Sequence, residues 1–430
     1  MANDKDFTLT NGIEVGGPTK NSLGTISASN AVDLSTGNYF THTPTGSTTY
    51  SFTNPGAVQS FQMQLTGGQE AVANAFSTTA YDGTGSNFTL TNGIDLAGDG
   101  GLVWTKQRNA TKNHVLIDTV RGSNKYLKSN TEDVQDTGST LVTGFNSDGY
   151  GVGTGGFANI SGGTYVSWVF KKTPKFFDIV TYAGNGSARS IAHNLGSVPG
   201  MIIIKGYDRS DGWAVYHRGH NGGTDPEDYV TFLSGSNAQS NSASHFNDTA
   251  PTSTHFTVGT ESMVNSSSNN YVAYLFGHDT TADSMIQCGS VAYNSGATVN
   301  LGWSPQWVMT KDTAVGNWNI ADAARGIGDD GSRGPTLYPD SSAGETANGA
   351  TVIRTATGFT MPSGVFNPST QLYVAIRSAA ATSITYPSSV KFQGGLAPQT
   401  PANGETDLLT FSTKDGGTSY TGVHSIDNAS

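Results

Sequence analysis

The chain has 430 residues, of which 55 are glycine and only 13% are charged, and its formal net charge is −11. The acidic balance and the scattering of its 22 basic residues argue against nucleic acid as a main partner, because phosphate binding requires clustered Lys and Arg. The single cysteine, Cys288, excludes an intrachain disulfide and an all-cysteine zinc site.

The overall composition predicts the fold class. Low charge with 35% apolar residues is typical of many short strands joined by Gly, Ser, Thr and Asn turns, and not of disorder. The start, Met1–Asp6, lacks the apolar core of a signal peptide, and no run of 18 apolar residues predicts a membrane span. No stretch shows apolar residues at helical spacing. We therefore expect an all-β, multidomain protein that is assembled in a reducing cytoplasm and does not insert into membranes.

The first regular pattern in the chain is a strand. Residues 59–66 alternate strictly between polar and apolar side chains, with Phe61, Met63 and Leu65 on one face. Strict alternation predicts a half-buried β-strand. The heptapeptide FTLTNGI occurs twice, at 7–13 and 88–94, which suggests a strand able to pair in two places.

The middle of the chain repeats itself. Short apolar segments ending in a lysine occur at 102–106, 201–205 and 307–311, and each is followed by an Arg-Gly pair at 121–122, 218–219 and 325–326. The lysine and the arginine are 15, 13 and 14 residues apart. A Tyr-Val strand closes each copy, at 165–170, 271–276 and 373–376. Three landmarks in a fixed order, three times, predict three copies of one β unit, spanning 69–172, 173–279 and 280–382.

The end of the chain changes character again. Short segments that contain apolar residues, 408–413 and 420–423, flank the turn sequence Asp415-Gly416-Gly417. Two short strands around such a turn predict a β-hairpin.

The three repeats resemble a domain that recurs in structural proteins of marine tailed phages, especially cyanophages. The resemblance rests on the lysine strands, the Arg-Gly corners and the closing strands, and in the first copy it extends over GLVWTK, DTVRG, YLKSN, GFNSDGYGVG and TYVSWVFKK. It implies lectin-like (jelly-roll or concanavalin-type) β-sandwiches. The third copy departs most, with Arg377 where the others have Phe170 and Phe276.

The flanks resemble a second phage module of the tail-fibre type. Its front half is similar to residues 32–65 and its back half to residues 383–423. In related phage proteins the two halves run together, whereas here more than 300 residues separate them. The resemblance implies a split β module, 1–68 with 383–430, for attachment or oligomerisation, into which the repeats are inserted.

The repeated basic residues are the first candidate sites. Residues repeated in repeated folds usually serve the scaffold, so we expect the lysines and arginines to tie corners to carboxylates or carbonyls. A ligand site shared by all copies is the alternative. These residues are Lys106, Arg121, Lys205, Arg218, Lys311 and Arg325.

Trp303 is the one candidate for glycan contact. It lies in a turn before Pro305, where an exposed indole could stack on a sugar ring, whereas most other tryptophans are expected in the core.

Metal and catalytic sites are weakly indicated. His217, His220, Asp225, Glu227 and Asp228 could be drawn as a metal cluster, but the other copies lack the histidines, so a polar loop is favoured. Residues 329–332, Asp-Asp-Gly-Ser, indicate a turn, and a calcium-binding loop is the less favoured alternative.

A lectin-like fold could also carry glycanase activity. No Glu-x-Asp-x-Glu run supplies the close carboxylate pair of a retaining glycosidase. The acidic group Glu132, Asp133 and Asp136 is expected in a solvated loop, and Cys288 in the core. We expect no catalytic residues, no metal and no cofactor.

The function implied by the resemblance is that of a virion structural protein, most directly a tail fibre or appendage subunit that attaches to host-surface glycans. Its partners would be other virion proteins and further copies of the chain, with a trimer suggested by fibre proteins. A capsid decoration or head-fibre protein is the alternative, and a glycan-degrading enzyme is a remote third reading.

Overall fold

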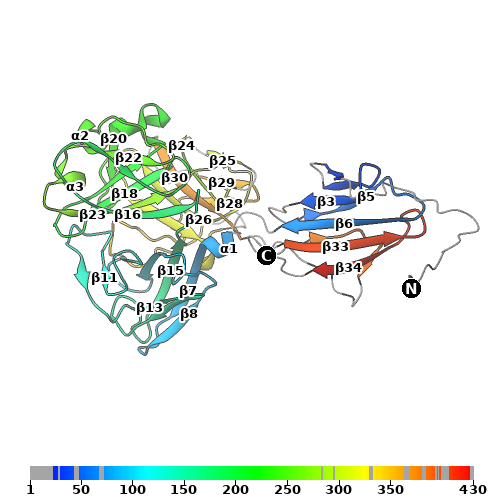
Figure 1. Ribbon diagram of the computed structural model, residues 1–430. Coiled ribbons are helices and arrows are strands. Elements are labelled where there is room, and N and C mark those ends of the chain that lie inside the picture. The colour runs from blue at the N-terminus through cyan, green and yellow to red at the C-terminus, as the bar shows by residue number, and fades with distance from the viewer. Residues whose placement is uncertain are drawn as a thin grey trace, which may run out of the picture. The chain divides into compact units, whose positions relative to one another are not determined.

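The computed structural model describes residues 23–27, 30–42, 48–66, 72–281, 284–293, 296–328, 333–362, 369–379, 384–392, 395, 397–398 and 406–426. The chain is all-β, as the sequence predicts, and the α-helices within these ranges have four residues each: α1 (Val72–Ala75), α2 (Ala243–Phe246) and α3 (Ser262–Asn265). Two compact units are present (Figure 1). We call Met1–Ala71 with Ala380–Ser430 the base unit, and Val72–Ala379 the repeat unit.

The base unit is built from both ends of the chain. Its main sheet has the order β3-β6-β33-β34-β32, and the long strands β6 and β33 pair antiparallel over eight residues each. A three-stranded sheet, β1-β2-β5, and the pair β4–β31 complete it. The strands are β1 (Thr25–Ile26), β2 (Ala31–Asp33), β3 (Tyr39–His42), β4 (Thr48–Thr49), β5 (Ser51–Thr53), β6 (Gln59–Thr66), β31 (Ile384–Thr385), β32 (Val390–Phe392), β33 (Thr406–Thr413) and β34 (Tyr420–Ile426).

The base strands bury one face only. In β33 buried residues alternate with partly exposed ones, and in β6 the buried Phe61, Met63 and Leu65 alternate with Ser60, Gln62 and Gln64. Phe61 stacks on Phe411 with 5.0 Å between ring centroids. The predicted strand 59–66 and the predicted hairpin around Asp415 are therefore confirmed, the latter as β33 and β34. The first FTLTNGI copy lies outside the described residues. The second begins with β8 (Phe88–Thr91), which pairs with β14 (Gly149–Val152).

Each repeat in the repeat unit forms a main sheet of the same order. The sheets are β10-β9-β15-β7 in repeat 1, β19-β18-β23-β16 in repeat 2, where β20 and β21 extend the sheet, and β27-β26-β30-β24 in repeat 3. Their strands are β7 (Phe76–Asp82), β9 (Gly101–Gln107), β10 (Val115–Asp118), β15 (Thr164–Lys171), β16 (Phe177–Ala183), β18 (Met201–Gly206), β19 (Trp213–His217), β20 (Tyr229–Phe232), β21 (Ser240–Asn241), β23 (Asn270–Phe276), β24 (Ile286–Ala292), β26 (Pro305–Asp312), β27 (Trp318–Asp322) and β30 (Thr370–Arg377).

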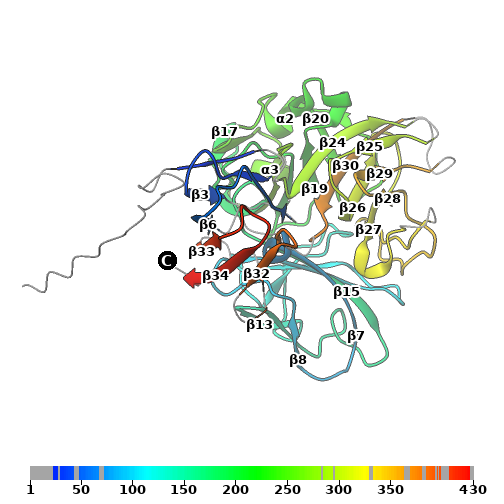
Figure 2. The ribbon, with the colours of Figure 1, turned by 90° about the vertical axis from the view of Figure 1, so that its right-hand side faces the viewer.

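A smaller second sheet covers one face of each main sheet. In Figures 1 and 2 these second sheets lie toward the outside of the repeat unit. They comprise β8 (Phe88–Thr91), β13 (Val142–Asn146) and β14 (Gly149–Val152), then β17 (Arg189–Ala192) and β22 (His255–Val258), then β25 (Thr298–Asn300), β28 (Ile353–Thr355) and β29 (Gly358–Thr360). The remaining elements are the pair β11 (Lys125–Tyr126) and β12 (Asp136–Thr137), and the 3₁₀ turns η1 (His220–Gly223), η2 (Pro226–Asp228) and η3 (Ala323–Arg325).

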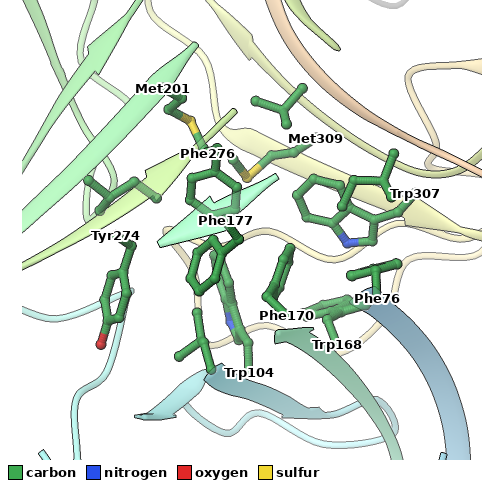
Figure 3. Close-up of a cluster of buried hydrophobic side chains, with 14 of the residues drawn as sticks. Phe76, Trp104, Trp168, Phe170, Phe177, Met201, Tyr274, Phe276, Trp307 and Met309 are labelled. Atoms are coloured by element: carbon green, nitrogen blue, oxygen red, sulfur yellow. The ribbon is translucent and has the colours of Figure 1, made fainter. Parts of the chain in front are cut away.

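The other faces of the three main sheets meet in one central core. Figure 3 shows aromatic and methionine side chains from all three repeats converging there. The ring of Phe170 in repeat 1 lies edge-on to Phe276 of repeat 2 and to Trp307 of repeat 3, at 5.5 and 5.8 Å between centroids. Each repeat also keeps its own core between its two sheets. The three sandwiches thus form one unit around a shared apolar centre.

Burial on both faces explains the sequence of the lysine strands. Every residue of β9, β18 and β26 is buried. In β9, Leu102 and Trp104 face the central core while Val103 faces the core of repeat 1. A strand covered on both sides reads as a continuous apolar run, which is the pattern at 102–104, 201–204 and 307–309.

Candidate functional site

The three repeated lysines shape the loops that follow their strands. We call residues 107–113, 207–212 and 313–317 the lysine loops. Lys106, Lys205 and Lys311 are fully buried. Each ammonium donates to the carbonyl of the residue that follows it and to a second carbonyl in its lysine loop, for example Lys205 Nζ to Gly206 O at 2.8 Å and to Arg209 O at 3.0 Å. Desolvation lowers the pKa of each lysine to about 8.

Two of the three arginine corners are ion-paired and shielded from water. Arg121 Nε donates to Asp118 at 2.6 Å, and Arg325 Nε donates to Asp322 at the same distance, with arginine side chains only 4% and 0% exposed. Gly122 and Gly326 follow with φ of +101° and +87°, a conformation that favours glycine.

The corner of repeat 2 is built differently. His217 occupies the register position of the two aspartates, since it lies opposite Met201 as Asp118 lies opposite Leu102. Arg218 follows His217 directly and is exposed. Gly219 is required by close approach, because a Cβ there would lie 2.9 Å from the Gly289 carbonyl in repeat 3.

Each corner contacts the next repeat in a cyclic order. Tyr274 of repeat 2 donates its hydroxyl to Asp118 at 2.8 Å. Trp168 of repeat 1 donates its indole N–H to Asp322 of repeat 3 at 2.9 Å. His217 of repeat 2 lies 3.1 Å, Nε2 to oxygen, from the Tyr373 carbonyl of repeat 3. Corner 1 therefore meets repeat 2, corner 2 meets repeat 3 and corner 3 meets repeat 1.

Reciprocal backbone hydrogen bonds close the ring at the lysine loops. We call residues 123–140, 233–239 and 338–346 the long loops. Each long loop forms two backbone hydrogen bonds with the lysine loop of the next repeat. One residue of the long loop donates its N–H, and the residue three positions before it accepts with its carbonyl. The pairs are Gln135 N to Tyr207 O with Asp211 N to Glu132 O, Gln239 N to Thr313 O with Gly316 N to Ser236 O, and Glu345 N to Arg108 O with Lys112 N to Ser342 O, all between 2.7 and 2.9 Å.

Trp303 does not form an exposed sugar platform. The structure leaves it only 6% exposed and packs it in the core between the two sheets of repeat 3, beside residues such as Val308 and Phe359. Gly302 before it is exposed, with φ of +80°, so the turn itself lies at the surface while the indole is buried. The expectation of glycan stacking at Trp303 is corrected by this burial.

The candidate metal cluster is not assembled. His217 and His220 are buried and hydrogen-bonded, His220 through Nε2 at 3.2 Å to the Thr231 hydroxyl. Desolvation lowers the pKa of His220 to about 3. Across the part of the chain that the structure describes, no group of three or more His, Cys, Asp or Glu could hold a metal ion. The Asp-Asp-Gly-Ser turn at 329–332 lies outside that part.

Three further residues from the sequence analysis have clear places. Cys288 is buried, its thiol lies 3.4 Å from the Gly277 carbonyl, and burial raises its pKa. Asp133 and Asp136 both pair with Lys128 at 2.8 and 2.9 Å, at the surface.

A hollow of about 300 Å³ opens between repeats 1 and 2. Sequence reasoning missed it: Glu132 drew attention only as part of an acidic group, and the other lining residues fall between the repeated landmarks, where the copies differ. Its lining comprises Glu132, Gly212, Phe232, Ser234, Gly235, Asn237 and Met263.

Comparison with known proteins agrees with the extent of the ring. No curated protein matches the chain. Among the described residues, no helix has the length and apolar character needed to cross a membrane. A family described as "Domain of unknown function (DUF7483)" matches residues 72–376, which is 305 of the 430 residues and nearly the whole repeat unit. The family thus treats the three repeats as one domain, and the chain belongs to this family.

Proposed function

We propose that the chain is a structural protein of a tailed-phage particle, a tail fibre or appendage subunit whose β-sandwich repeats attach to glycans on the host surface. The observation that carries the proposal is the closed ring. Three sandwiches share one core and lock their loops together, which makes a rigid scaffold with long loops at the junctions. Loops held on a rigid scaffold are a common place for binding sites.

The motif resemblance supports the phage assignment, and the base unit supports a role in assembly. Its long strands β6 and β33 come from opposite ends of the chain, so the repeat unit occupies a connection within the base module. Such an insertion keeps both ends of the repeat unit tethered to one module. We propose that the base unit docks to other virion proteins or to copies of itself.

A capsid decoration or head-fibre protein is the second candidate. The observation that favours it is the absence, within the described ranges, of a coiled coil or other fibrous shaft: the helices there have four residues. A compact ring of sandwiches linked to a sheet module is also suited to coating a shell.

Cryo-electron microscopy of the intact particle tests both candidates. We expect density for this chain around the tail, in a copy number that follows the tail symmetry. Density spread over the capsid would overturn the fibre assignment in favour of decoration, and absence of the chain from purified particles would overturn the virion assignment.

Glycan attachment has its own test. Fluorescently labelled full-length chain should bind host cells, and mild periodate oxidation of the cell surface should abolish the binding, because periodate cleaves sugar diols. Binding that is unchanged by periodate but lost after protease treatment of the cells would indicate a protein receptor instead.

A further inference from the structure

We infer that the hollow between repeats 1 and 2 binds one neutral sugar ring, an inference that rests on the glycan attachment proposed above. At about 300 Å³ the hollow is at the lower end of the range for ligand pockets, which suits a single ring and not an extended chain. It belongs to one chain and needs no second copy.

The walls of the hollow are held by two junctions of the ring. The backbone of Glu132 is held in place through its carbonyl, which accepts from Asp211 N at 2.9 Å and lies 3.4 Å from the Lys205 ammonium. On the other side, the Phe232 carbonyl accepts from the indole N–H of Trp318 in repeat 3 at 2.9 Å. A site whose backbone is already fixed loses little entropy when a ligand binds.

The lining combines the two chemistries that a sugar ring presents. Phe232 and Met263 are half-buried and offer an apolar surface for the C–H face of the ring. Glu132, Ser234 and Asn237 offer a carboxylate, a hydroxyl and an amide for its hydroxyl groups. Within the described part of the chain, these three side chains make no hydrogen bond to another residue, so their polar atoms are available to a ligand.

The charge of the hollow selects against acidic sugars. No described cation forms an ion pair with the Glu132 carboxylate, whereas the nearby Asp211 is neutralised by Arg209 at 2.7 Å. The Lys205 ammonium acts on the Glu132 carboxylate through space but forms no ion pair with it. The carboxylate therefore still repels the carboxylate of a uronic or sialic acid and accepts hydrogen bonds from neutral hydroxyls.

Among the three described junctions, only one carries a carboxylate at this position. The backbone position of Glu132, which accepts from the lysine loop of the next repeat, is taken by Ser236 and Ser342 at the other two junctions. Neither serine supplies a carboxylate. We therefore expect one sugar bound per chain and not three.

The test uses the full-length chain and saturation-transfer NMR with glucose, galactose, N-acetylglucosamine and glucuronic acid. We expect saturation transfer to at least one neutral sugar and none to glucuronic acid. Glu132→Gln should weaken binding about tenfold, the usual effect of losing a hydrogen bond to a charged group. Gly212→Val should abolish binding, because a Cβ there lies 3.0 Å from the Met263 methyl and 3.8 Å from the Ser234 hydroxyl.

Asp148→Asn is the matched control. Asp148 is exposed in a turn of repeat 1, so this variant loses the same charge outside the hollow and should bind like the parent chain. Unchanged thermal unfolding of all three variants would show that the fold is intact.

Each other outcome is decisive. Sugar binding that survives both Glu132→Gln and Gly212→Val would place the site elsewhere and overturn the inference, while leaving glycan attachment standing. Equal binding of glucuronic acid would overturn the charge argument. No sugar binding at all would overturn the inference, and the periodate experiment on cells then decides glycan attachment independently.

Discussion

The base unit and the repeat unit bury their strands in different ways. In the base unit, β33 alternates buried and partly exposed residues, so one face meets the core and the other does not. In the repeat unit, β9, β18 and β26 are buried along their full length. An antiparallel sheet usually leaves one face to solvent, so a continuous apolar strand in such a sheet signals a second packing partner. Here that partner is the neighbouring repeats.

The largest expected effect comes from the central core. Phe170→Ala should lower the free energy of unfolding of the repeat unit by about 3–5 kcal/mol, the usual cost of truncating a buried phenylalanine. Because Phe170 contacts aromatic rings of all three repeats, hydrogen exchange should accelerate in all of them. Phe61→Ala in the base unit is the matched control, with a similar cost confined to that unit. Faster exchange in repeat 1 alone would contradict a shared core.

The next effect concerns the buried corner of repeat 3. Asp322→Ala should cost about 3–5 kcal/mol, because it leaves the buried Arg325 guanidinium with only its longer ion pair to Glu345, at 3.3 Å, and removes the acceptor of the Trp168 indole. Urea denaturation of the repeat unit measures the change.

Asp99→Ala provides the comparison for that corner. Asp99 pairs with Lys171 at 3.0 Å, but its side chain is 54% exposed, and such pairs contribute about 0–1 kcal/mol. Equal losses of unfolding free energy in Asp322→Ala and Asp99→Ala would show that water reaches the Asp322 corner.

The smallest effect is a dependence on pH. Burial lowers the pKa of His114, His217 and His220, the last to about 3, so these side chains stay neutral in the folded repeat unit. In the unfolded chain a histidine titrates near its usual pKa of about 6.5. Below that pH the unfolded state binds more protons than the folded state, so stability falls as pH decreases from about 6.5 toward 3.

Calorimetry at pH 7.5 and 5.5 measures this loss. Each fully buried histidine should cost about 1 kcal/mol at pH 5.5, since one pKa unit corresponds to about 1.4 kcal/mol. The base unit, where His42 is only partly buried, should lose less. An unfolding transition of the repeat unit that moves no more than that of the base unit would show that the buried histidines accept protons without unfolding.

Much of the strand pattern could be predicted from the sequence. Alternation located β6, the Asp-Gly-Gly turn located the hairpin β33–β34, and repetition located β9, β18 and β26. These strands could be predicted because their patterns depend on which side chains are apolar, and the sequence gives the side chains directly.

The closing of the ring could not be predicted in the same way. The six hydrogen bonds between long loops and lysine loops join backbone atoms, so residues as different as Glu132 and Ser236 occupy equivalent positions. The hollow depends on those loops and was missed with them. His217 and His220 suggested a metal by their spacing, yet both ring systems are satisfied inside the protein. Trp303 suggested exposure because it lies in a turn, yet its indole packs in the core of repeat 3.

Because the three repeats contact one another in cyclic order, this single polypeptide is organised like a trimer. In a trimer of identical subunits, every substitution appears at all three junctions at once. Here each junction has its own copy of the sequence and has diverged: Asp118 with Tyr274, Asp322 with Trp168, and His217 with a backbone carbonyl. One junction can therefore change while the other two preserve the assembly, which leaves this chain able to evolve a new surface at a single position of the ring without losing the ring itself.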